Sequence, residues 1–154
     1  MKPRLLIAAA LATCAGSAVF AQSTATVDVT ASVLPVCVFQ TLSAPVSFDS
    51  IRPDSTEGVT KTVELLYRCT KNMRHKVEVN ESATGKTTGA LAADGSKETL
   101  PVSVKWATAE RRGLGFSDNK VLSLELEASI EPDHFRDLAA GDYRGVLLVT
   151  VTAE

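Results

Sequence analysis

The sequence has few of the residues on which metal sites and most active sites depend. Its 154 residues include two histidines, three cysteines and one tryptophan, and only 5% of them are aromatic. His75 and His134 lie far apart in the chain, and neither stands at the spacing of a metal-ligand pair. We therefore expect no metal site and no bound cofactor.

Sequence signatures of catalysis are also missing. Ser117 in GLGFSD lacks the Gly-X-Ser-X-Gly context of a nucleophilic serine. Glu125 and Glu127 alternate with leucines, which is typical of the solvent face of a strand rather than of a carboxylate pair in a cleft. The sequence thus predicts a protein that is not an enzyme, and a small secreted hydrolase is the weakest hypothesis.

Apart from its start, the chain has no long hydrophobic run. Basic residues precede the apolar run 5–12, and small residues then lead to Ala21. This is the form of a secretory signal peptide, which would cover residues 1–21. The run is too short to serve as a stable membrane anchor. Lipidation of Cys14 is the less favoured alternative, because a threonine precedes it where a lipobox has a smaller residue.

No sign of charge dominates the remaining chain. Without residues 1–21, 133 residues are left, with 14 basic residues against 18 acidic ones and a net charge of −4. That length suits one domain, and the weak negative charge argues against nucleic acid as a partner. The basic stretch 71–76, which contains His75, and the pair Arg111-Arg112 are predicted to be solvated turns rather than a site for an acidic partner.

Only two cysteines, Cys37 and Cys69, follow the signal peptide. In an exported protein the default prediction is one disulfide. It would close a loop of roughly 33 residues, for which chain entropy gives about 3.5–4 kcal/mol of stabilisation. Two free buried thiols are less expected outside the cytosol, and a metal site lacks the histidine pair that would complete its shell.

Most of the remaining chain alternates apolar and polar residues with period two, which predicts strands. We expect a short helical turn within 133–140 and, for the glycine-containing stretch 81–99, a loop with at most a small edge strand. The expected strands cover residues 25–33, 36–42, 46–48, 59–69, 77–80, 100–108, 120–130 and the C-terminal stretch from Tyr143.

About seven short strands separated by turn signals predict an antiparallel β-sandwich of immunoglobulin-like type. The cysteines do not follow the antibody pattern, because Cys37 and Cys69 both lie in the first half of the chain and Trp106 is not between them. The sequence therefore predicts a sandwich whose disulfide joins different strands from those in an antibody domain.

The first strand has no visible hairpin partner, because no tight turn links residues 25–33 to a second strand. Its apolar positions are Val27, Val29, Ala31 and Val33. Burying each valine contributes roughly 1.5–3 kcal/mol, whereas ordering each residue costs about 1–2 kcal/mol. Side-chain burial alone therefore does not hold this strand in place. It needs a ladder of backbone hydrogen bonds, either inside its own sandwich or along the edge of another molecule.

Four stretches together resemble pilin subunits of the chaperone–usher type. The resemblance is strongest to the archaic class, the spore coat protein U-like domain family, and it covers nearly all of residues 24–154. The stretches are an alternating segment before the first cysteine (ATVDVTASVLPVC), a phenylalanine after it (VSFDSI), a strand that ends in the second cysteine (VELLYRC), and the C-terminal AAGDYRGVLLVTVTA.

The resemblance implies an all-β, incomplete immunoglobulin-like antiparallel β-sandwich that is completed by donor-strand exchange. Residues 22–33 would be the N-terminal donor-strand extension and residues 34–154 the pilin domain. The donor residues would be Val27, Val29, Ala31 and Val33. A C-terminal strand, after which no further strand is expected, would edge the acceptor groove through Tyr143, Leu147, Val149 and Val151; Tyr143 is equally explained as a core or corner tyrosine.

The function that this family implies is that of a structural or adhesive subunit of a cell-surface pilus, or fimbria. Its partners would be a periplasmic chaperone, an outer-membrane usher and other pilin subunits, and it would be exported through the periplasm. The alternative is a secreted, self-complete β-sandwich that binds a carbohydrate or a protein. In that alternative residues 25–33 pair within their own chain.

Overall fold

The structure is a computed structural model that describes residues 23–108 and 111–154. The predicted signal peptide and Cys14 lie outside the described residues. The chain divides into two units, Met1–Ser32 and Val33–Glu154. In the first unit, the described residues 23–32 form neither helix nor strand, and their side chains are exposed.

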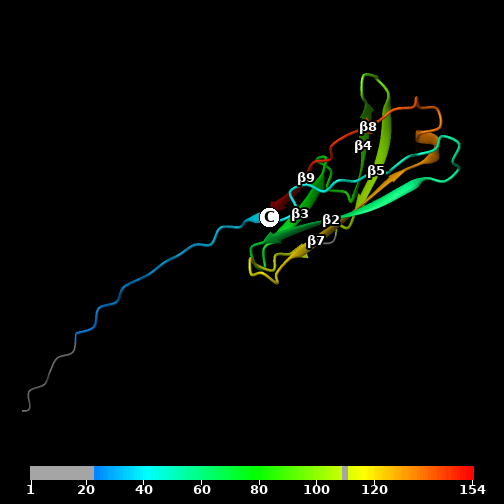
Figure 1. The fold of residues 1–154 in the computed structure, drawn as a ribbon. Helices are drawn as coiled ribbons and strands as arrows, with labels where there is room; N and C mark the ends of the chain where they lie inside the picture. Colours follow the sequence, from blue (N-terminus) through cyan, green and yellow to red (C-terminus); the bar gives the residue numbers. More distant parts are fainter. Residues whose placement is uncertain (1–22, 109–110) are drawn as a thin grey trace, which may run out of the picture. The chain divides into compact units, whose positions relative to one another are not determined.

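The second unit is an all-β fold of two antiparallel sheets that curl into a half-barrel, which confirms the predicted sandwich-like class. The larger sheet has six strands in the order β1-β2-β7-β5-β4-β8, and the smaller sheet has the order β6-β3-β9. Figure 1 shows the long strands β2 and β7 side by side, with β3 and β9 close to the C-terminus. The strands are β1 (Cys37–Phe39), β2 (Val59–Cys69), β3 (Arg74–Val79), β4 (Lys86–Ala93), β5 (Thr99–Trp106), β6 (Arg111–Arg112), β7 (Leu122–Ile130), β8 (Tyr143–Arg144) and β9 (Val149–Ala153).

The core lies on one face of the larger sheet, as the period-two pattern predicts. Strand β7 alternates strictly, with every apolar residue from Leu122 to Ile130 buried. It pairs along nine residues with β2, where Leu65 stands opposite Leu124. Strand β5 supplies a second buried row that ends at Trp106. Each such side chain contributes roughly 1.5–3 kcal/mol when it leaves water.

The predicted disulfide joins Cys37 to Cys69. The two residues are direct partners in the short β1–β2 ladder. Thr70 extends the attachment, because its hydroxyl donates to the Leu34 carbonyl at 3.1 Å and accepts from the Val36 amide at 3.0 Å. A disulfide indicates an oxidising, exported compartment.

Among residues 23–108 and 111–154, no helix is both long enough and apolar enough to cross a membrane.

The stretch 81–99 was expected to be a loop with at most a small edge strand. That prediction is wrong, because the stretch contains the eight-residue strand β4. Strand β4 pairs with β5 along seven residues and with β8 along two. Its inward positions include Gly89, where a Cβ atom would lie 2.8 Å from Cδ2 of Leu147. The glycine therefore makes room for a leucine of another segment, and this tertiary contact outweighs the low strand propensity of glycine.

The C-terminal stretch differs from the predicted single strand. Strand β8 joins the larger sheet and β9 joins the smaller one, with residues 145–148 between them in no strand. The inward alternation nevertheless persists, because Tyr143, Leu147, Val149 and Val151 are all partly buried against the core. The expected helical turn is a short 3₁₀ helix, η1 (Pro132–His134), with Pro132 in its first turn.

Two other expected features are different in the structure. Residues 46–48 form no strand. The pair Arg111-Arg112 is a short strand, β6, rather than a turn, and it pairs with Arg74 and His75 of β3. Arg111 is held there because its guanidinium donates to the Ser123 carbonyl.

Candidate functional site

The principal candidate site is an open apolar groove of about 1340 Å³ in the second unit. Single small-molecule pockets usually measure roughly 300–1,000 Å³. The groove is therefore large enough for an extended polypeptide segment. Its lining runs from Phe39 to Val149 and comes from both the sheet and the irregular segments around it.

The floor of the groove is the inner face of the larger sheet. Four strands contribute to it, and all the residues are apolar or glycine. Leu126 and Ile130 are almost completely buried even though they line the groove. The floor is formed by Val63, Leu65, Gly89, Leu91, Leu100, Val102, Leu126, Ala128 and Ile130. Such a surface offers hydrophobic contact and no ionisable group for chemistry.

The walls of the groove are irregular segments rather than strands. One wall is residues 41–51, which follow β1, and the other is residues 139–149, around β8 and the start of β9. Within the described part of the chain, no backbone–backbone hydrogen bond is made by residues 42–48 or by Val146 and Leu147. Both walls therefore carry amide and carbonyl groups that an incoming strand can pair with.

Large apolar side chains are exposed along the same walls. Leu42 is 89% exposed and Val146 is 92% exposed, with Leu148 also exposed at 65%. Soluble monomers rarely leave unpaired backbone groups and large exposed apolar side chains together, because both promote association. The groove thus has the properties of a surface that another segment covers.

Tyr143 lines the groove and is held in place by hydrogen bonds of its hydroxyl group. Its hydroxyl lies 2.9 Å from the Ala139 carbonyl oxygen and 3.1 Å from a Glu98 carboxylate oxygen. The same carboxylate accepts from the Ala139 amide at 3.1 Å. A tyrosine that reaches back to the backbone four residues upstream is typical of the corner of immunoglobulin-like sandwiches. Its ring packs partly buried against the core.

The predicted donor residues belong to neither sheet. Val27, Val29, Ala31 and Val33 are all exposed, at 80%, 88% and 84% for the three valines. They lie in no strand of the described chain. The chain thus contains an alternating apolar segment without a ladder and, separately, an apolar groove whose walls have free backbone groups.

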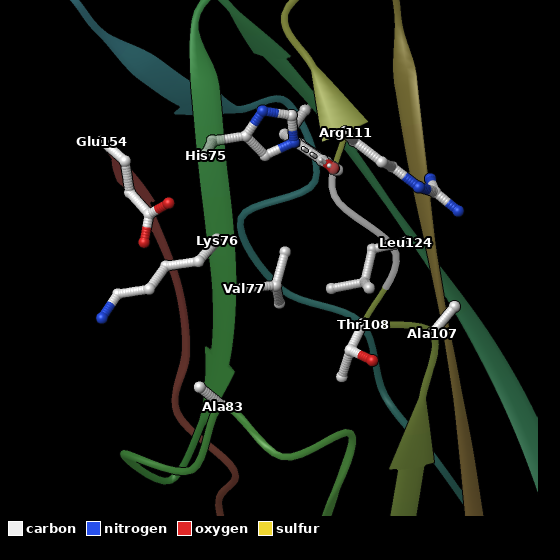
Figure 2. A pocket seen from close by; sticks show the side chains of 10 residues that line it. His75, Lys76, Val77, Ala83, Ala107, Thr108, Arg111, Leu124 and Glu154 are labelled. Carbon is white, nitrogen blue, oxygen red and sulfur yellow. Dashed lines mark hydrogen bonds between the residues drawn. The ribbon is translucent and has the colours of Figure 1, made fainter.

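A second cluster, of Tyr67, His75 and the Cys37–Cys69 disulfide, lies in the interior. The prediction that His75 lies in a solvated turn is wrong, because His75 occupies β3 and is only 6% exposed. The Tyr67 hydroxyl oxygen and the Nε2 atom of His75 are 2.9 Å apart. Figure 2 shows this contact beside the side chain of Arg111, which comes from β6. Burial lowers the pKa of His75 and raises the pKa of Tyr67.

Of the predicted groove-edge residues, Tyr143, Leu147 and Val149 line the groove and Val151 does not. Sequence reasoning missed the wall formed by residues 41–51 and the burial of His75. The stretch 71–76 is rich in charge, and its one inward-facing polar residue cannot be recognised from composition. A signal did exist, because His75 stands two residues before Val77 and four before Val79, on the same face of the strand.

Compared with known proteins, the chain matches no family model and no curated protein sequence.

Proposed function

We propose that this protein is a subunit of a cell-surface polymer, a pilus, whose domain is completed by a β-strand donated from another copy. In this proposal the donated strand is residues 25–33, and the acceptor is the apolar groove. Before assembly a periplasmic chaperone covers the groove, and an outer-membrane usher carries out the exchange. The observation that carries the proposal is the groove itself, with an apolar floor and with residues on both walls, 42–48 and Val146 with Leu147, that make no backbone–backbone hydrogen bond in the described part of the chain.

The chemical match between segment and groove supports this assignment. Residues 25–33 have apolar side chains at every second position, which would face the floor while the polar ones face solvent. An incoming strand meets two walls with unpaired backbone groups and can form hydrogen bonds on both sides.

The energetics explain why the walls matter as much as the floor. Ordering the nine residues 25–33 costs about 1–2 kcal/mol each, which exceeds what three valines and one alanine return on burial. Each backbone hydrogen bond adds a net 0.5–1.5 kcal/mol or so. A strand bonded along both edges thereby changes a net loss into net binding.

The alternative, a self-complete sandwich that acts as a monomeric binding module, requires residues 25–33 to pair within their own chain. In the described chain they lie in no strand, and their side chains are exposed. The floor of the groove is apolar, and its polar lining residues, such as Asp49, Asp142 and Arg144, come from the walls. These observations favour the polymer subunit.

A pair of matched substitutions tests the proposal in cells that carry the chaperone and usher. Val29→Asp places a charge on the apolar face of residues 25–33, and Thr30→Asp places the same charge one residue later, on the opposite face. We expect Val29→Asp to abolish the ladder of heat-sensitive oligomers on unheated gels. Thr30→Asp should keep the ladder.

A second readout separates folding from assembly. Both variants should accumulate in the periplasm as chaperone-bound, oxidised subunits, because the altered residues are outside both sheets. Oligomer ladders of equal intensity in the two variants would refute the proposal. So would a purified wild-type protein that is a stable monomer without chaperone.

A further inference from the structure

We infer that the disulfide and His75 form a latent metal site, which binds a zinc-class divalent cation once Cys37 and Cys69 are reduced. This inference is independent of the groove and of the proposed polymer function. It rests on the position of His75, which the sequence alone did not reveal.

Three potential ligand atoms converge at this place. The two Sγ atoms and one ring nitrogen of His75 all lie within 4.8 Å of one another. In a tetrahedral zinc site with sulfur ligands at about 2.3 Å and nitrogen at about 2.0 Å, ligand atoms are separated by roughly 3.5–3.8 Å. The ligand role therefore requires the two freed sulfurs to move apart by side-chain rotation, from cysteines that are direct partners in the β1–β2 ladder.

The surroundings of His75 resemble those of a histidine ligand. Its Nδ1 atom is buried and has no hydrogen bond of normal geometry within the described residues, although the Met73 backbone also acts on the ring. Its Nε2 atom is instead held by the Tyr67 hydroxyl at 2.9 Å. Metal-binding histidines typically use one nitrogen for the metal and fix the ring by a hydrogen bond from the other. The nitrogen without a normal hydrogen bond and the oriented ring are therefore both explained by a ligand role.

Solvent reaches the ring of His75 through a pocket whose lining includes neither Cys37 nor Cys69. This pocket measures about 220 Å³ and is lined by Tyr67 and by His75, which Figure 2 labels. Two cysteines and one histidine leave one position of a tetrahedral shell free, which water fills in zinc sites of this composition. Arg111 lines the same pocket, and its charge opposes a cation. Two thiolates offset that charge after reduction.

The chemistry balances as a two-electron exchange followed by ligand binding. A dithiol reductant gives two electrons and two protons to the Cys37–Cys69 bond and is itself oxidised to a disulfide. The cation then binds the two sulfurs as thiolates, and two protons are released to solvent. Metal and disulfide exclude each other, so an occupied site blocks reoxidation of this cysteine pair.

Cobalt(II) is a suitable probe, because thiolate ligation gives it an intense absorption that oxygen or nitrogen ligands alone do not. The purified protein is reduced with a phosphine, the phosphine is removed without air, and cobalt(II) is added. We expect one equivalent to bind with a thiolate absorption band that zinc(II) abolishes. The oxidised protein should show no such band.

Variants of the two histidines provide a matched comparison. His75→Gln should weaken cobalt(II) binding by about tenfold or more, while His134→Gln, on η1, should leave it unchanged. Tyr67→Phe should weaken it about tenfold through loss of ring orientation. Equal affinity in His75→Gln and His134→Gln, or no thiolate band in the reduced wild type, would overturn the inference.

The proposed metal site can be tested even if the protein unfolds when its disulfide is reduced. If the reduced wild type loses the near-ultraviolet circular dichroism of its packed aromatic residues, zinc(II) should restore it in the wild type but not in His75→Gln. Failure of zinc(II) to restore the wild-type signal would also refute the site.

Discussion

Removing the disulfide should destabilise the domain strongly and should open one wall of the groove. The perturbation is the double variant Cys37→Ala/Cys69→Ala, in which alanine adds no buried polar group at the fully buried Cys69. The sequence separation of 32 residues gives about 3.5–4 kcal/mol of lost chain-entropy stabilisation. That is a large share of the roughly 5–15 kcal/mol that holds a typical domain together.

The effect should be greatest around β1, because this strand is only three residues long and pairs only with β2. Residues 41–51, which form one wall of the groove, follow directly after it. Without the bridge, this part of the chain keeps the short ladder, the Thr70 hydrogen bonds and the hydrogen bonds of Gln40 and Thr41 to Leu66.

Urea unfolding and amide hydrogen exchange together check this prediction. At a slope of about 1–3 kcal/mol per molar urea, the midpoint should fall by about 1–4 M. Exchange should accelerate most in residues 36–51, and reduced wild-type protein should behave like the variant. A free energy of unfolding within about 1 kcal/mol of the oxidised wild type would refute the reasoning.

Three further predictions concern the buried cluster around His75 and a tightly packed glycine. Tyr67→Phe leaves Nε2 of His75 unpaired in the interior and should cost about 1–3 kcal/mol in urea unfolding. Gly113→Ala should prevent stable folding or lower the melting temperature sharply, because its Cβ atom would lie 2.0 Å from the Thr70 carbonyl oxygen. The control is Gly141→Ala, whose Cβ atom would meet no atom within 4 Å, and its stability should be close to that of the wild type. Burial depresses the pKa of His75 in the folded state below its ordinary value of 6.5, so the unfolded chain takes up the proton first. The stability that this residue contributes is complete above about pH 6.5 and is lost as the pH falls through the folded-state pKa; the wild type should therefore lose more stability than His75→Gln between about pH 7.5 and pH 5.5.

Period-two alternation was sufficient to predict most of the larger sheet. In β5, in β7 and in β2 from Val63 onward, every second residue is apolar, so the buried face follows directly from the sequence. The pairing of Cys37 with Cys69 followed from the absence of any other cysteine after the signal peptide.

The features that sequence reasoning missed depend on contacts between distant segments. Gly89 lowers the strand propensity of β4, yet the strand pairs along seven residues with β5, and Leu147 fills the space beside the glycine. His75 stands among charged residues, and only the approach of Tyr67 and the disulfide gives it a buried environment. The break between β8 and β9 comes from their pairing with different sheets, which a continuous alternation does not reveal.

The central claim is that residues 25–33 of one molecule occupy the groove of another. A photo-cross-linking amino acid placed at position 29 tests it most directly in assembled material, with the same probe at position 30 as control. We predict intermolecular cross-links from position 29 to groove-floor residues such as Val102 and Ala128, found by mass spectrometry in a covalent dimer, and none of these from position 30. Cross-links from position 29 that lie only within one chain, or that miss the groove, would contradict the account.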